Sequence, residues 1–463
     1  MMNDFPLNVP WKHVATLLWN GYVEEAIRLS EFTEYDEKKL ELFKESKDSL
    51  TSNIKKGLNV YVDSTTLSTA SQIVLWQKVP NAFTFFDLGI LTASLVLFDH
   101  VYLPSGSTGN HFAELINKEL DEKVVDCLEF DGVAGEIPYT IAANIHNILQ
   151  DDDKLHEELV LEWRKIFGTS VPKSVNFSSV HMVSPQRFSH FLSSLEGLDR
   201  KVDPSNLSDF ISGSTFRTFF NHEISRIIEL PYLPNSARGV IESKIYHMIE
   251  GQIPQIDMFL KIVKRKLDVE LEIIRSEVSI QTGLPLLLSV VMQKMKSIED
   301  YFEVVKELRG KSNRYRKKIG KAIEATVKGD VRSVSNTIRI FKGNYGAVFD
   351  FLKEIGKGAT QTAMCIAPNI SPFLEETLDV LKAGKYLVRA TNDVGLARRF
   401  YTRLFKPHIW FIEDIRSSAR RMLSVDYGFK KIWKTTIDTN NKRLLARIVA
   451  NYPFDGLKSI GNN

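Results

Sequence analysis

Asp63 is the first residue of the chain whose type and position could support chemistry. It follows the alternating apolar run of residues 58–62, which predicts a buried strand, and it precedes Ser64, Thr65 and Thr66. Ligands of α/β proteins usually bind beyond the carboxyl ends of strands, so an acid at this point is a candidate functional residue. The position suits equally well a residue that caps a turn or a helix after the strand. Both interpretations stay open.

The sequence around Asp63 resembles the opening of PIN-like nucleases, and the resemblance is limited to the N-terminal α/β module. It rests on the strand that ends in Asp63, on residues 99–104 (Asp-His-Val-Tyr-Leu-Pro) and on Glu114. In that family, carboxylates hold a divalent ion, Mg²⁺ or Mn²⁺, that activates water against a phosphodiester. The resemblance implies that Asp63 and Glu114 are catalytic metal ligands, with Asp126 or Asp131 as the third acid. The alternative is that these acids are ordinary solvated side chains.

Two clusters of basic residues are candidates for binding a polyanion. Residues 309–321 hold seven cations, and four of them share one face if the segment is helical: Lys311, Arg314, Lys318 and Lys321. Each cation on such a face can neutralise a phosphate. Aromatic residues interleave with a second set of cations, Arg398, Arg399 and Arg403, and more cations follow in residues 416–434. In that pattern cations follow a nucleic-acid backbone and rings stack on bases. In the alternative interpretation the rings are core residues and the cations only solvate the helices.

The two parts of the chain differ in charge. Residues 301–463 carry 31 Lys and Arg against 15 Asp and Glu, a net charge of +16. Residues 1–300 carry 29 against 42, a net charge of −13, so the overall charge of +3 conceals the division. The asymmetry predicts a basic surface that binds nucleic acid or another polyanion, and an acidic surface that repels it. Two solvated surfaces of opposite bias are the alternative.

Other catalytic motifs find little support. Arg217 and His222 have the Arg-x₄-His spacing of HEPN-type ribonucleases, but this short spacing recurs at Arg403 and His408. A surface arginine and an ordinary helical histidine are therefore the favoured interpretation. Residues 356–360 lack the upstream glycine of a phosphate-binding loop, and neither H-E-x-x-H nor G-x-S-x-G occurs. We expect no cofactor, except Mg²⁺ or Mn²⁺ if the protein is a nuclease.

Composition predicts a folded protein of the cytoplasm. Apolar residues make up 43% of the 463 residues and charged residues 25%, which is enough to bury a core. The two cysteines, Cys127 and Cys365, are too far apart in sequence to indicate a disulfide framework, which favours a reducing compartment. We expect no secretory signal, because residues 1–6 lack a basic start followed by an apolar core. We expect no membrane partner, because no apolar run reaches about 18 residues.

The elements that position these residues are predicted to be a small parallel sheet and many helices. Strands at residues 58–62 and 95–103, with a helix at 83–93 between them, predict a parallel βαβ unit. Further strands are expected at 124–130 and 174–183, whereas two prolines make residues 230–234 a stiff connector. Helices are expected at residues 111–120, 154–167, 216–228, 256–280 and 298–308. The apolar stripes of the last two predict an antiparallel hairpin. The fold class is mostly α, with a small N-terminal α/β module followed by helical bundle regions.

Composition also suggests three domains and two functions. The domains are an acidic α/β module with flanking helices (residues 1–185), a helical bundle (186–355) and a basic helical region (356–463). The favoured function is that of an intracellular bacterial nucleic-acid-associated interaction protein, a component of a larger assembly such as an antiviral defence system. A protein partner or a homo-oligomer is compatible with it. The alternative is a metal-dependent PIN-like nuclease that uses carboxylates near Asp63. Acids that converge at the sheet edge would favour the nuclease, and scattered acids the interaction protein.

Overall fold

A computed structural model describes five parts of the chain: residues 45–129 apart from 46, 49 and 106, 153–170, 207–241 apart from 229, 231 and 236, 287–327, and 426–451. The described part is mostly helical (69%) with a small parallel sheet. The chain forms two compact units. The first comprises residues 1–54, 129–229 and 237–266, and the second residues 55–128, 230–236 and 267–463. The domain boundaries expected from composition stay a prediction.

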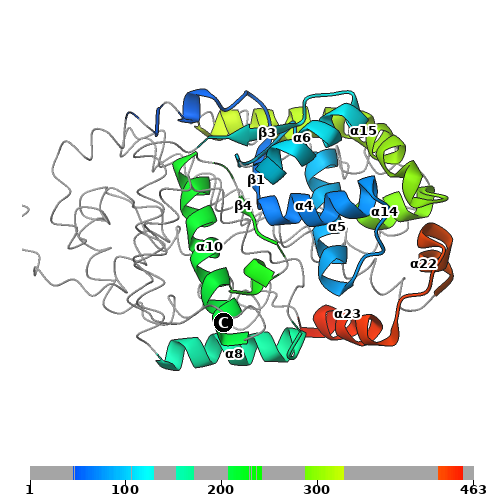
Figure 1. Ribbon diagram of the computed structural model, residues 1–463. Coiled ribbons are helices and arrows are strands. Elements are labelled where there is room, and N and C mark those ends of the chain that lie inside the picture. The colour runs from blue at the N-terminus through cyan, green and yellow to red at the C-terminus, as the bar shows by residue number, and fades with distance from the viewer. Residues whose placement is uncertain are drawn as a thin grey trace, which may run out of the picture. The chain divides into compact units, whose positions relative to one another are not determined.

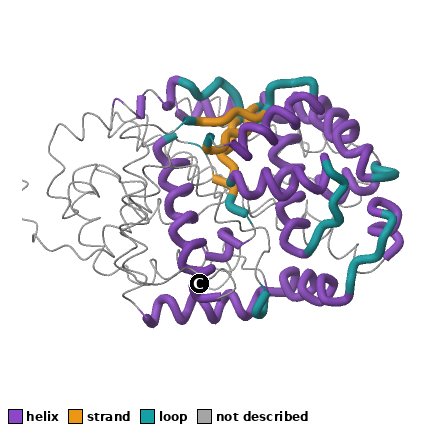
Figure 2. Tube along the Cα trace, in the orientation of Figure 1, coloured by secondary structure: helices purple, strands orange, loops and turns teal. Residues whose placement is uncertain are grey.

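The second unit is built on a four-stranded parallel sheet (Figure 1). Its strands are β1 (Asn59–Val62), β2 (His100–Pro104), β3 (Val125–Leu128) and β4 (Tyr232–Leu233), in the order β3-β2-β1-β4. Figure 2 shows them side by side in orange. Asn59 pairs with His100, and Tyr61 pairs with both Tyr102 and Tyr232. The predicted βαβ unit and its third strand are confirmed.

The two central strands are buried on both faces. Val60, Tyr61 and Val62 of β1 are all buried, and so are Val101, Tyr102 and Leu103 of β2. Strands of a parallel sheet that is covered on both sides carry such continuous apolar runs, because neither face meets water. This explains why the runs were recognisable as strands in the sequence.

Two helices connect β1 to β2, where one was expected: α4 (Ser64–Leu75) and α5 (Ala82–Leu97). The prediction of a strand at residues 95–103 was wrong in its first part, because residues 95–97 form the last turn of α5 and the strand begins at His100. All 16 residues of α5 are buried except Thr84. A helix that is apolar on every side lacks the 3.6-residue periodicity of a surface helix, so its end resembles a buried strand.

Helix α5 is the central helix of the second unit. It packs against α4, against α14 (Leu287–Lys294), against α15 (Tyr301–Val327) and against α23 (Thr439–Asn451). Helix α6 (Ser107–Leu120) packs on α4 and β3. A 3₁₀ turn, η2 (Ile298–Asp300), precedes α15, and α22 (Asp426–Trp433) precedes α23. The core of this unit therefore lies between the sheet and a layer of helices around α5.

Two predictions in the second unit need correction. The helix expected at residues 298–308 does not stop near Gly310, because α15 runs through this residue to Val327. A Cβ atom at Gly310 would meet nothing within 4 Å, so the glycine marks an open side of the helix and not its end. Residues 230–234, expected to be a stiff connector, contain the strand β4. The Asp63 amide, just after β1, donates a hydrogen bond to the Leu233 carbonyl of β4 over 3.3 Å. Flanking prolines are compatible with a short strand at the edge of a sheet.

The first unit contains two described helices that share an aromatic core. They are α8 (Asp153–Phe167) and α10 (Leu207–Ile227). The ring of Trp163 lies 4.4 Å from that of Phe167 and 5.0 Å from that of Phe210, centroid to centroid. The helices expected at residues 154–167 and 216–228 are confirmed, although α10 begins earlier. The strand expected at 174–183 and the helix expected at 256–280, with its hairpin, lie outside the described residues. Among the described helices, none is long and apolar enough to cross a membrane.

Candidate functional site

A polar cluster lies on one side of the sheet of the second unit. Tyr102 pairs with Tyr61 on one side and with Asp126 on the other, so these three side chains point to the same face. Asn59 and His100 form the adjacent row on that face. We call Lys55, Asn59, His100, Tyr102 and Asp126 the sheet cluster. Sequence reasoning singled out only Asp126, but polar residues at alternate positions of neighbouring strands were a usable signal.

Asp126 is the centre of the sheet cluster. Its Oδ2 lies 2.7 Å from Lys55 Nζ and 3.6 Å from His100 Nδ1, and its Oδ1 lies 3.3 Å from Lys123 Nζ. The Lys55 amide donates to the Tyr102 hydroxyl over 2.8 Å, and Asn59 Nδ2 donates to the Lys55 carbonyl. Two ammonium groups thus neutralise the one carboxylate. This arrangement disfavours a divalent cation at Asp126, because the cation would have to displace both lysines.

Burial and charge set the protonation of His100. Burial lowers its pKa, and Lys55 lowers it further, while Asp126 and Asp99 raise it. The lowered pKa favours the neutral imidazole, and its Nδ1 has no hydrogen-bond partner among the described residues. Burial also raises the pKa of Tyr102. A neutral histidine beside a carboxylate can accept a proton, so the cluster has the groups for acid–base chemistry but not for holding a metal.

Asp63 caps a helix. Its side chain is buried, its Oδ1 accepts from the Thr65 amide at the start of α4 over 2.9 Å, and its Oδ2 accepts from the Tyr232 hydroxyl over 3.1 Å. An aspartate at this position satisfies an amide at the start of the helix that has no partner within the helix. The interpretation of Asp63 as a cap residue is thereby confirmed. Both of its oxygens are engaged by groups of the second unit.

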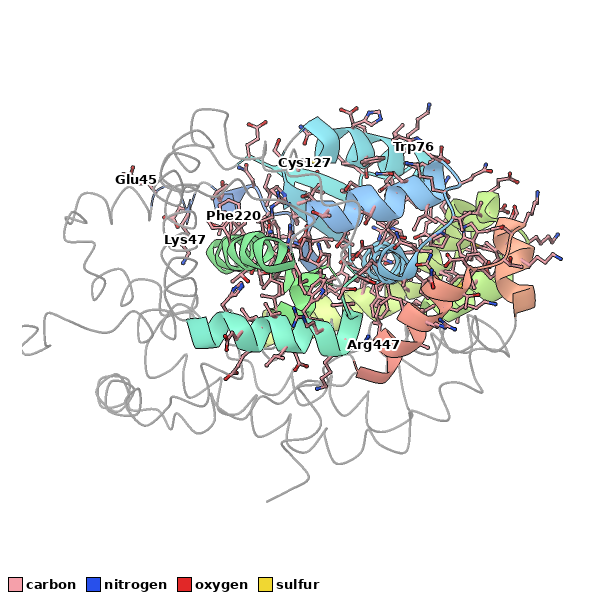
Figure 3. The ribbon with its side chains drawn as sticks, turned by 60° about the horizontal axis from the view of Figure 1, so that its bottom comes forward. Glu45, Lys47, Trp76, Cys127, Phe220 and Arg447 are labelled. Atoms are coloured by element: carbon pink, nitrogen blue, oxygen red, sulfur yellow. The ribbon has the colours of Figure 1, made fainter. Side chains whose placement is uncertain are left out.

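The three acids implied by the resemblance to nucleases stand at different places in the second unit. Asp63 follows β1, and Asp126 lies on β3, two strands away, so their backbones are about 10 Å or more apart. Glu114 is exposed on α6. Its charge and that of Asp126 add to burial in raising the pKa of Cys127 (Figure 3) to about 11. No three His, Cys, Asp or Glu side chains of the described residues form a group that could hold a metal ion. Asp131 lies outside the described residues.

Arg309, from the first predicted basic cluster, is buried in the core. Its side chain is 5% exposed, and all five of its N–H groups donate hydrogen bonds. Two of them go to the carboxylate of Glu122, from Nε over 2.7 Å and from Nη2 over 2.9 Å. The other three go to carbonyls at the end of α5: Leu95, Phe98 and Asp99. The carbonyls at the C-terminal end of a helix lack hydrogen-bond donors within the helix, and the guanidinium group of Arg309 provides these donors.

Arg316 is buried beside Arg309. Its Nε donates to Asp99 Oδ1 over 2.8 Å, and its Nη1 donates to the Val96 and Arg309 carbonyls and to Ser312 Oγ. Asp99 Oδ2 accepts from the Leu58 amide over 2.8 Å, so this carboxylate links α15 to the start of β1. Gly57 has a φ of 137°, and a Cβ atom there would lie 2.9 Å from Asp99 Oδ2. Arg309 and Arg316 therefore hold the second unit together and are not available to a phosphate.

Of the cations that the sequence predicted to bind a polyanion, the structure describes the side chain of Lys311 only. Lys311 is partly exposed on α15 and forms an ion pair with Glu307, which also binds Lys294 over 2.8 Å. Arg314, Lys318 and Lys321 lie on α15, but their side chains are outside the described residues, as are Arg398, Arg399 and Arg403. Lys311 is thus the one whose surroundings are known, and a carboxylate already neutralises it.

The C-terminal helices carry cations that are exposed to solvent. Lys430 on α22, Lys434 just after it and Arg443 on α23 are exposed, and no described residue forms an ion pair with any of them. Residues 426–451 hold six Lys and Arg against two Asp. Four of their larger apolar residues, Phe429, Ile432, Leu445 and Ile448, are buried. Core packing thus uses the apolar side of these helices and leaves the three cations in solvent.

The Arg-x₄-His pair lies on α10 of the first unit. Arg217 is half-buried and not a surface residue as expected, and burial lowers its pKa to about 10. His222 lies on the same helix, with a side chain outside the described residues. The helical location of both residues is confirmed.

Comparison with protein-family models, with curated proteins and with solved structures finds no match in any of the three. The resemblance to PIN-like nucleases therefore depends on the local sequence pattern alone. Function has to be argued from the charges and contacts of the chain itself.

Proposed function

We propose that the protein is a nucleic-acid-associated interaction protein that binds nucleic acid, or another polyanion, through its basic C-terminal region. The observation that carries the proposal is the set of three exposed cations on α22 and α23, Lys430, Lys434 and Arg443, for which the described residues provide no carboxylate. A cation without an internal partner can exchange its counterion for a phosphate and release that ion to solution. A buried or paired cation cannot do so without losing its present bonds.

The distribution of charge over the whole chain supports the same proposal. Residues 301–463 keep a net charge of +16, although Arg309 and Arg316 are used internally. The acids that outnumber the cations in residues 1–300 oppose binding of a polyanion to that part of the chain. The proposal therefore assigns binding to one region and not to the protein as a whole.

The proposal is tested by titrating the full-length protein with RNA and DNA oligonucleotides at two salt concentrations. Binding through several phosphate contacts is expected to weaken steeply as salt rises. No binding at low salt would overturn the proposal. Binding that salt leaves unchanged would also overturn it, because contacts without counterion release would then account for the affinity.

The metal-dependent nuclease remains a second hypothesis, favoured by one observation. Asp63 stands at the carboxyl end of a central parallel strand, where ligands of such sheets bind. If Asp63 is a metal ligand, Asp63→Asn abolishes Mg²⁺- or Mn²⁺-dependent cleavage of nucleic acid. If it only caps α4, the variant melts within a few degrees of wild type, because asparagine also caps helices well. A wild-type protein that cleaves no nucleic acid with either ion would count against the nuclease.

A further inference from the structure

The turn between α4 and α5, residues 76–81, exposes an aromatic side chain on the second unit. Trp76 is 51% exposed and Val79 is 52% exposed, and they are the exposed large apolar residues of this unit's described part. Figure 3 labels Trp76 at the end of α4. The turn contains one charged residue, Lys78, and neither Asp nor Glu. The exposed ring and the cation beside it together offer a flat apolar surface and a positive charge to a ligand.

The turn is rigid enough to hold the ring in place. The amides of Trp76 and Lys78 both donate to the Gln72 carbonyl, over 3.2 and 3.3 Å, and Gln77 has a φ of 54°. The ring of Trp76 packs against that of buried Phe112, with 5.3 Å between centroids and a tilt of 54°. Non-glycine residues adopt positive φ only where the surroundings enforce it. The indole is thus anchored on one side and remains half in solvent.

A cation accompanies the ring. Lys78 Nζ lies 5.3 Å from the centroid of Trp76 and donates to Gln72 Oε1 over 2.7 Å. No described carboxylate pairs with Lys78. Of the three N–H donors of its ammonium group, one binds Gln72, so a phosphate can bind the others while the cation stays next to the aromatic surface.

The same turn leads into the end of α5 that meets the basic helix α23. The amide of Ala82, the first residue of α5, donates to Asn441 Oδ1 on α23 over 3.2 Å. Arg443, one of the three exposed cations, follows two residues later on α23 and lies on a different side of this helix from Asn441. The six residues from Trp76 to Asn81 span at most about 17 Å between their end Cα atoms when fully extended, so a single strand of nucleic acid can contact both ends of the turn. Figure 1 shows the start of α5 close to α23.

From these contacts we infer that Trp76 is a stacking platform for a base of single-stranded nucleic acid, whose phosphates bind Lys78 and the exposed cations of α22 and α23. The inference rests on the proposed function, and it specifies single-stranded nucleic acid as the ligand. Bases of a single strand can leave their stack and lie on a ring, whereas bases inside a duplex present only their edges. A protein partner fits less well, because two apolar side chains are far less than the roughly 800 Å² that each partner buries in a stable interface.

The test compares a single-stranded oligonucleotide with a duplex of the same sequence, each titrated against full-length wild type and Trp76→Ala by fluorescence anisotropy. Loss of one stacked base corresponds to about 1–3 kcal/mol, so Trp76→Ala is expected to bind the single strand about 5- to 150-fold more weakly. Its affinity for the duplex should change less than about twofold. Trp76→Phe, which keeps a ring, should retain most of the single-strand affinity.

Val79→Ala is the matched control, because it removes apolar surface of similar exposure from the same turn without removing a ring. It should bind both nucleic acids as wild type does, and thermal melting should show that all variants fold. If wild type binds neither nucleic acid, the proposed function itself fails. If wild type binds but Trp76→Ala binds the single strand equally well, or if Val79→Ala loses as much, the inference fails while the proposed function stands.

Discussion

Helix α15 and the pair α22–α23 are both rich in cations, yet the second unit uses them in different ways. Helix α15 carries eight Lys and Arg against three acids, and residues 426–451 carry six against two. In α15, Arg309 and Arg316 are only 5% and 6% exposed, and Lys311 is paired with Glu307. In α22 and α23, Lys430, Lys434 and Arg443 are exposed and without a described partner. A similar density of charge therefore serves the core in one region and the surface in the other.

The difference comes from the groups that face each helix. Helix α15 passes the C-terminal end of α5. The carbonyls there lack partners within the helix, and together with the carboxylates of Asp99 and Glu122 they accept hydrogen bonds from the arginines of α15. Arginine presents five donors in a planar arrangement and can satisfy several such acceptors at once, which lysine cannot do. Helix α23 meets the N-terminal end of α5, which presents amide donors; Asn441 Oδ1 accepts from the Ala82 amide there, and a cation has no acceptor to offer. The neighbouring helix end, and not the number of cations, decides their role.

The largest expected effect is on stability, at Arg309. Arg309→Ala leaves three backbone carbonyls and the Glu122 carboxylate without their donors, so the free energy of unfolding should fall by at least about 3 kcal/mol. Lys306→Ala, which removes an exposed cation from the same helix, should change it by no more than about 0.5 kcal/mol. Urea unfolding of both variants measures the difference. Equal stability of the two would mean that α15 is a surface helix and that the comparison is wrong.

A smaller effect is expected from pH at Glu122. Hydrogen bonds from Arg309 hold the pKa of Glu122 below its ordinary value of 4.5. The pair therefore stabilises the fold fully above pH 4.5, and this contribution is lost as the pH falls through the lowered pKa. The melting temperature of Glu122→Gln should lie below that of wild type at pH 7, with a difference that shrinks below pH 4.5. Glu303→Gln, at an exposed acid of α15, should melt like wild type throughout; a pH-independent deficit at Glu122 would refute the ion-pair explanation.

Part of this arrangement could be predicted from the sequence and part could not. The apolar runs around β1 and β2 indicated a parallel unit, because strands buried on both faces leave that pattern. Strand β4 could not be predicted, because two residues between prolines carry no periodicity. The role of Arg309 was also hidden, because its acceptors lie 187 to 214 residues away in sequence. Asp63 was correctly placed at the end of β1, but its function as a cap depends on Thr65 and Tyr232, which only the fold brings to it.

The most direct test of the central claim compares the salt dependence of single-strand binding between two triple variants of the full-length protein. The first is Lys430→Gln with Lys434→Gln and Arg443→Gln. The second is Lys123→Gln with Lys294→Gln and Lys311→Gln, which removes the same charge from lysines that already pair with carboxylates. Each phosphate contact contributes about 0.7 to the slope of log K against log salt concentration for single strands. The account predicts that the first variant lowers this slope by up to about 2 and the second leaves it unchanged. Equal losses in both variants, or a loss in the second alone, would contradict the account.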